Sequence, residues 1–109
     1  MKTAQAAERL GLKILCMPCP DKEITGGYAG DLLSWVMGRA NEGDAWITIM
    51  SNVNVVAVAS LADVACVILA ESVELDEDII RTAQDKGINI LSSDAPAFKV
   101  ALMLGEALK

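Results

Sequence analysis

Residues 45–71 read AWITIMSNVNVVAVASLADVACVILAE, and this stretch decides the fold. Its first seven residues, AWITIMS, have the β-branched and aromatic content of a buried strand. The run VACVILAE at 64–71 is apolar almost throughout, as expected of a strand that is covered on both faces. We interpret residues 51–63 between them as a helix that Ser51 or Asn52 caps, although its valines also favour a strand. The stretch therefore predicts a β-α-β unit with two parallel strands.

Strand and helix signals continue to alternate on the C-terminal side of this unit. Residues 75–87 carry the clearest helix signals, with Asp76 as the cap and Gly87 as the stop. A strand is expected over 88–93, and Asp94 then opens a final helix. The apolar face expected of this helix is formed by Phe98, Ala101, Leu102 and Leu108.

The N-terminal side predicts a helix over 3–10, a strand over 12–16 and a short, glycine-weakened strand within 22–28. Asp31 is then expected to cap a helix over 31–40 that has a wide apolar face. The whole pattern predicts an α/β fold, a mainly parallel sheet of four to five strands with flanking helices. A chain of 109 residues fits one domain, residues 1–109.

Composition and charge exclude several classes of function. The net charge is −6 and the nine basic residues are scattered, which argues against nucleic acid as a partner. The longest apolar runs fall far short of the roughly 20 residues that span a membrane, and the N-terminus lacks the apolar core of a signal peptide. Three cysteines do not make a disulfide framework. We therefore expect a cytoplasmic protein with reduced thiols.

The glycine-rich run TGGYAGD at 25–31 is one of three loops, with 51–54 and 92–96, expected at the carboxyl ends of strands, where ligands bind in parallel sheets. Glycines before a helix can expose backbone N–H groups to an anion, or they can form a turn with positive φ. We favour the turn, because no basic residue is near and Asp31 would repel an anion. The candidate ligand-binding residues are Thr25, Gly26, Gly27, Asp31, Ser51, Asn52 and Asn54.

The motif CMPC at 16–19 could bind zinc or cycle as a redox dithiol. Structural zinc is usually bound by four Cys or His ligands, and beyond this pair only Cys66 remains. Pro20 and its neighbours indicate a loop, whereas a redox dithiol usually has its first cysteine at a helix N-terminus, which stabilises the thiolate. We interpret the pair as incidental and keep Cys16 and Cys19 as redox candidates. The chain has no histidine, which excludes Ser–His and Cys–His nucleophile pairs. We expect no catalytic residues, no metal and no cofactor.

The run GGYAGDLLSWVMGRANEGDAWITIMSNVNVVAVASL at 26–61 resembles the DRTGG domain family, in particular its small stand-alone members associated with iron hydrogenase components. The similarity continues through ACVILAESVELDEDIIRTAQDKGINILSS and covers nearly the whole chain. The resemblance implies an α/β fold similar to the N-terminal domains of HPr kinase/phosphorylase and of the Mur ligases. It also implies an accessory or regulatory module, often at a subunit contact, to which no catalytic activity is assigned.

The chain departs from the family pattern at two places. The name-giving pentapeptide is absent, and residues 23–27 (EITGG) keep only its Thr-Gly-Gly. Where close relatives read W-I-T-I-Q-T-H-x-N, this chain has Met50 and Asn52 at the Gln and His positions and keeps Asn54. Any role that needs an imidazole at that position is therefore lost.

Three functions fit these observations. The first is a non-catalytic regulatory or scaffolding module that acts through protein–protein contacts, with a partner in a hydrogenase or redox system. The second is a sensor of a small, nucleotide-type ligand, and the third is a thiol redox partner that uses Cys16 and Cys19.

The segment 53–70 has one charge in eighteen positions, so an outer helix is expected to present apolar residues to water. This surface, together with the family's position at subunit contacts, predicts a two-fold homodimer. The interface candidates are Trp35, Val55, Val58 and Leu61.

Overall fold

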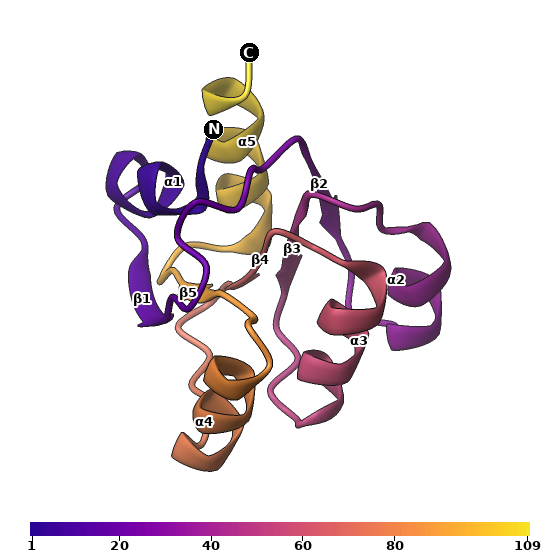
Figure 1. Ribbon diagram of the computed structural model, residues 1–109. Coiled ribbons are helices and arrows are strands. Elements are labelled where there is room, and N and C mark those ends of the chain that lie inside the picture. The colour runs from indigo at the N-terminus through magenta and orange to yellow at the C-terminus, as the bar shows by residue number, and fades with distance from the viewer.

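The computed structural model describes all 109 residues, and it has a five-stranded sheet between two layers of helices (Figure 1). The strands are β1 (Lys13–Cys16), β2 (Gly26–Ala29), β3 (Asp44–Thr48), β4 (Cys66–Leu69) and β5 (Ile90–Ser92). The helices are α1 (Thr3–Arg9), α2 (Leu33–Arg39), α3 (Asn54–Ala62), α4 (Glu77–Asp85) and α5 (Ala97–Ala107). None of these helices has both the length and the apolar character needed to cross a membrane.

The sheet has the order β1-β5-β4-β3-β2. Strands β2, β3, β4 and β5 run parallel, and β1 pairs antiparallel with β5 at one edge. The prediction of a mainly parallel α/β sheet is therefore confirmed. Every residue of β3, β4 and β5 is buried, because these strands have neighbours on both sides and helices on both faces.

The three helices that connect the parallel strands all cover one face of the sheet. Val36 of α2, Val55 of α3 and Ala83 of α4 belong to one buried cluster, with Trp46 and Val67 of the sheet. The strands β2 to β5 follow one another across the sheet, so crossovers of one hand leave every connecting helix on the same side. The parallel strands therefore lack the crevice that forms where connecting helices switch faces, the usual ligand site of doubly wound folds.

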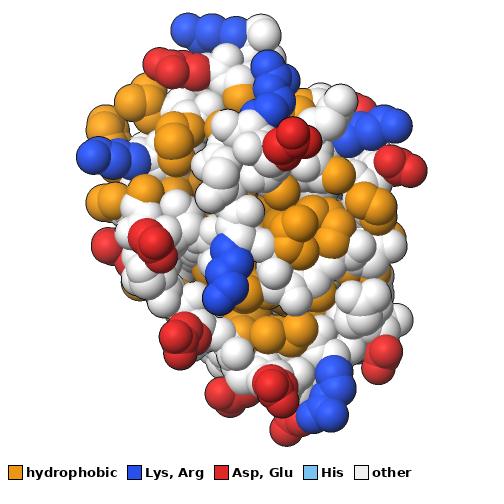
Figure 2. Space-filling view, turned by 90° about the vertical axis from the view of Figure 1, so that its left-hand side faces the viewer, with side chains coloured by type: hydrophobic (Ala, Val, Ile, Leu, Met, Phe, Trp, Pro, Cys, Tyr) orange, Lys and Arg blue, Asp and Glu red, His pale blue; other side chains and the backbone are white.

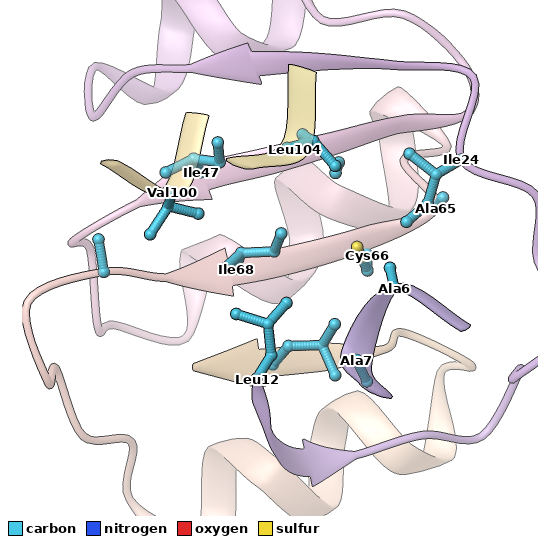
Figure 3. Close-up of a cluster of buried hydrophobic side chains, with 13 residues drawn as sticks. Ala6, Ala7, Leu12, Ile24, Ile47, Ala65, Cys66, Ile68, Val100 and Leu104 are labelled. Carbon is cyan, nitrogen blue, oxygen red and sulfur yellow. The ribbon is translucent and has the colours of Figure 1, made fainter. Parts of the chain in front are cut away.

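The opposite face of the sheet is covered by α1 and α5, which lie at the two ends of the chain (Figure 3). Val100 and Leu104 of α5 pack over Ile47 and Ile68 of the sheet, and alanines of α1 cover the part nearer β1. The partly buried Ala97 and Ala101 allow α5 to approach the strands closely. This packing fixes which side of α5 faces the sheet.

The sequence prediction of the apolar face of α5 was right for Ala101 and Leu108, which pack against the core, and wrong for Phe98 and Leu102. Phe98 and Leu102 point to solvent and are 78% and 52% exposed, whereas Val100 and Leu104 are buried. Both pairs have helical i, i+4 spacing, so periodicity alone could not choose between them. The sheet selects the stripe flanked by alanines, and the bulkier stripe is left outside.

Candidate functional site

Asp31 lies at the carboxyl end of the sheet but does not cap α2, as the sequence had suggested. The N-cap position of α2 is Leu32, which makes no side-chain cap hydrogen bond. Instead, Asp31 Oδ1 accepts hydrogen bonds from Thr48 Oγ1 (2.8 Å) and from the backbone N–H of Ile49 (3.0 Å). The carboxylate therefore ties the β2–α2 loop to the end of β3 through its Oδ1.

The glycines of the TGG run lie at the other end of the sheet. Gly26 opens β2 and pairs with Asp44, the first residue of β3, so it lies at the amino ends of these strands. Strand β2 rises about 3.3 Å per residue, which puts Gly26 roughly 10 Å from Ala29 at the carboxyl end. Thr25, Gly26 and Gly27 are therefore separated from Asp31 by the length of the strand, and the predicted ligand-binding residues do not form one site.

The prediction that Gly26 or Gly27 forms a turn with positive φ was also wrong. Both residues are in β2, and the glycine with positive φ near them is Gly43, at +84°. A Cβ on Gly27 would lie 3.0 Å from Leu104 Cδ2, and one on Gly26 would lie 2.9 Å from Asp44 Oδ1. These glycines leave room for α5 and for the start of β3. Their role is close packing, which the sequence alone could not show.

Ser51, Asn52 and Asn54 are all exposed at the start of α3, beside the end of β3. Asn52 Oδ1 accepts the backbone N–H of Asn54 (2.9 Å), while the N-cap position itself is Val53. Asn52 therefore supports the start of the helix from one residue before the N-cap, and neither Asn52 nor Ser51 is the N-cap residue that the sequence had suggested. This group carries no basic side chain that could neutralise a phosphate.

The interface candidates on α3 divide into buried and exposed residues. Val55 and Val58 are 0% and 5% exposed, because this side of α3 packs on the sheet. Their prediction as interface residues was wrong, since a nearly all-apolar helix does not reveal which side is covered. Leu61, at the C-terminal end of α3, is 72% exposed.

Trp35 is half-exposed on α2, with the Arg39 guanidinium 3.7 Å from its ring centroid. Leu32 precedes it by three residues and is the N-cap, so both residues lie at the start of α2. Ile49 is tied to the same loop through Asp31, and all three apolar side chains are exposed. We call Leu32, Trp35 and Ile49 the α2 patch. Of these three residues, sequence analysis named only Trp35 as an interface candidate.

The cysteines are placed as packing residues. Cys16 Sγ donates to the Ile88 carbonyl (3.2 Å), and the partly buried Cys19 Sγ donates to the Gly87 carbonyl (3.5 Å). Burial raises the pKa of the Cys16 thiol above its usual value, and a backbone hydrogen bond at Ile90 opposes this effect. Burial raises the pKa of Cys66 to about 12. A raised pKa suppresses the reactive thiolate, which argues against a redox dithiol.

A cavity of about 300 Å³ lies between the β4–α4 loop and the β1 edge. Lys13, Ser92 and Asp94 line it, and Asp94 accepts a hydrogen bond from Ser72 Oγ (2.8 Å) instead of capping α5. Basic and acidic side chains are interspersed over the side of the molecule that carries β1 (Figure 2). No group of three or more cysteines and carboxylates is placed to hold a metal ion. The cavity offers no concentrated charge for an ionic ligand.

Comparison with known protein families identifies the fold. The model of the DRTGG domain matches residues 29–107, nearly three quarters of the sequence. The chain belongs to the DRTGG domain family. The matched part of this DRTGG domain begins at the last residue of β2, so the TGG run, α1 and β1 lie outside it. No curated protein matches the chain.

A solved structure with the same fold contains the CBS and DRTGG domains of the regulatory region of Clostridium perfringens pyrophosphatase, complexed with the activator diadenosine tetraphosphate. The TM-score is 0.73 at 14% sequence identity, over 94% of this chain and 45% of that chain. The DRTGG domain described here therefore spans less than half the length of that neighbour. At this identity the similarity shows the shared fold, in agreement with the family match.

Proposed function

We propose that this DRTGG domain is a non-catalytic regulatory or scaffolding module that acts through protein–protein contacts. The observation that carries the proposal is the α2 patch, where Leu32, Trp35 and Ile49 are exposed at the carboxyl ends of β2 and β3. In parallel α/β folds this end of the sheet holds the ligand or the catalytic groups. Here it presents these three apolar side chains beside the polar Ser51, Asn52 and Asn54, and an exposed apolar group suits a protein surface.

The chemistry of the patch supports contact with a protein. Exposed apolar surface that is removed from water contributes about 25 cal/mol per Å². Trp and Arg are enriched at the centres of interfaces, and in this patch the Arg39 guanidinium is already stacked on Trp35. The solved neighbour points in the same direction, because its DRTGG domain lies in the regulatory region of an enzyme.

We extend the proposal to the cellular setting. The resemblance of 26–61 to stand-alone members associated with iron hydrogenase components suggests a partner in a hydrogenase or other redox system, in the cytoplasm. In such a system the domain would serve as a binding subunit, since Cys16 and Cys66 are buried thiols with raised pKa. The thiol redox hypothesis is therefore the least supported of the three.

A photo-crosslinking amino acid at position 35 tests the proposal in cells of the native host. We expect a discrete crosslinked polypeptide from Trp35 and none from Gln84, a matched exposed position on the distant helix α4. Mass spectrometry of the crosslinked band identifies the partner. If probes at Leu32, Trp35 and Ile49 all crosslink no polypeptide, the α2 patch is not a protein contact and the proposal is wrong.

A nucleotide sensor is the second candidate, favoured by the diadenosine tetraphosphate bound to the solved neighbour. The exposed Ser51, Asn52 and Asn54 would be its binding groups in this chain. It ranks second, because these residues and Asp31 supply no positive charge for a polyphosphate. Isothermal titration with diadenosine tetraphosphate tests it directly, and heat that saturates at one site per chain would move it to first place.

A further inference from the structure

We propose that the outward face of α5 pairs with α5 of a second copy of this chain, across a two-fold axis close to Leu102. The inference rests on the proposed function and names one partner for it. The surface consists of Phe98, Lys99, Leu102, Gly105 and Glu106, all of which are exposed. It lies on the side of α5 opposite the buried Val100 and Leu104, and is therefore separate from the α2 patch.

The apolar side chains on this face are matched to small ones at the other end of the helix. Phe98 is the only phenylalanine of the chain and is 78% exposed, and Leu102 follows one turn later. A Cβ placed on Gly105 would have no heavy atom within 4 Å, so the helix has open space there. In an antiparallel pair centred near Leu102, Phe98 of each copy would lie over Gly105 of the other. A large residue then meets a small one at both symmetric positions.

The charges follow the same symmetry. Lys99 and Glu106 are seven residues apart, which is two turns or about 10 Å, so they cannot pair within one helix. Neither takes part in any ion pair of the structure. In the antiparallel arrangement Lys99 of each copy comes beside Glu106 of the other. The two-fold axis therefore creates two identical Lys99–Glu106 ion pairs between the copies, as expected of an isologous interface.

The apolar surface continues from α5 to the free edge of the sheet. β2 is hydrogen-bonded only to β3, and its Gly27 and Ala29 are exposed. A groove of about 260 Å³ between this edge and α5 is lined mainly by apolar residues, among them Ala101 and Leu108. Gly105 belongs both to this groove and to the outward face of α5, so a partner helix seated on α5 would also reach the groove.

The size of this surface sets the expected affinity. A helix of eleven residues is about 16 Å long. Such a helix and its groove reach only the low end of specific interfaces, which bury about 800 Å² per partner at standard size. We therefore expect a weak dimer, with a dissociation constant in the micromolar range, that strengthens at low salt because the ion pairs lie at the rim.

Charge reversal tests the arrangement by sedimentation equilibrium. We expect Lys99→Glu and Glu106→Lys each to weaken dimerisation at least tenfold, because each places like charges together at two positions. The double variant K99E/E106K keeps the net charge and should restore the dissociation constant to within about threefold of the original. Phe98→Ala should abolish the dimer, and circular dichroism confirms that all variants, being at exposed positions, remain folded.

Three results would overturn the inference. They are a monomer at about 100 μM, single reversals without effect, and a double variant as weak as the single ones. A dimer that Trp35→Ala dissociates while the α5 variants do not would also overturn it, yet would leave the protein-contact function in place. Conversely, rescue by the double variant without any crosslink from positions 32, 35 and 49 would support the α5 pair and reject the α2 patch.

Discussion

Replacement of Gly43 by alanine should destabilise the domain, although Gly43 is in a surface turn and contacts no ligand. Gly43 has φ of +84°, a region that costs a residue with a Cβ about 1–2 kcal/mol. Its Cβ would also lie 2.5 Å from Thr25 Oγ1, so the Thr25 side chain must rotate. Rotation away from a preferred rotamer costs about 1 kcal/mol. The expected loss in the free energy of unfolding is therefore about 2–3 kcal/mol.

Thermal and urea denaturation of the same samples measure this loss. A domain of about this size loses roughly 4–8 °C in Tm per kcal/mol, so Gly43→Ala should lower Tm by about 10 °C or more. Thr25→Ala in the same chain removes the steric part, and the double variant should recover about 1 kcal/mol. Gly38→Ala is the control, since its Cβ meets no atom and alanine favours the interior of α2.

A Gly43→Ala protein as stable as the original would refute the reasoning, because neither the strained φ nor the clash could then exist as described. If Gly43→Ala lowers the free energy of unfolding equally with and without Thr25→Ala, the backbone strain at Gly43 is real but the clash with Thr25 is not. The same substitution at Gly27 should cost less than at Gly43. There the added methyl meets only the end of the Leu104 side chain, at 3.0 Å, and the residue is in an ordinary strand.

Three further predictions concern burial on α3, the Cys66 thiol and nucleotide binding. Val58→Glu should unfold the domain, as measured by circular dichroism, because it buries a carboxylate in the core. Leu61→Glu is the control on the exposed side of the same helix, and it should change the free energy of unfolding by less than about 0.5 kcal/mol. The Cys66 thiol has a pKa of about 12 in the folded protein, against an ordinary value of about 9. Between these two pH values only the unfolded state loses the thiol proton, so the free energy of unfolding should fall as pH rises. The slope is about 1.4 kcal/mol per pH unit in urea titrations, and Cys66→Ala should remove that part of it. If the domain binds diadenosine tetraphosphate with a micromolar dissociation constant, a hundredfold excess over that constant should raise the free energy of unfolding by about 2.7 kcal/mol. A rise in Tm near 10 °C in a thermal-shift assay would then support the sensor hypothesis. We expect a change below about 1 °C, the result of a chain that does not bind this nucleotide.

The strands were predictable because their signal is local. An apolar run such as 64–71 can be satisfied only by burial on both faces, and β4 within it is fully buried. The helices were located well but oriented less well. Residues 53–62 are apolar on nearly every side, so the sequence could not show that Val58 faces the sheet while Leu61 faces water.

The candidate site was less predictable, since it depends on partners far away in the sequence. Aspartate is a residue type that commonly caps helices, yet the Asp31 carboxylate accepts hydrogen bonds from Thr48 and Ile49, seventeen and eighteen residues away. Gly27 is glycine because of Leu104, a residue on another element. The one residue of the α2 patch that the sequence identified was Trp35, because tryptophan is enriched at interfaces.

The antiparallel pairing of β1 with β5 has a consequence for how the protein is made. Strands β3, β4 and β5 each pair with the strand synthesised just before, so β2 to β5 can assemble in order as the chain leaves the ribosome. β1 emerges first, but its partner Ser92 follows Lys13 by about 80 residues, and closing so long a loop is slow. Until β5 arrives, the apolar side chains of β1 have no sheet to join. β1 is therefore expected to join the sheet after the other four strands, although it is synthesised before them.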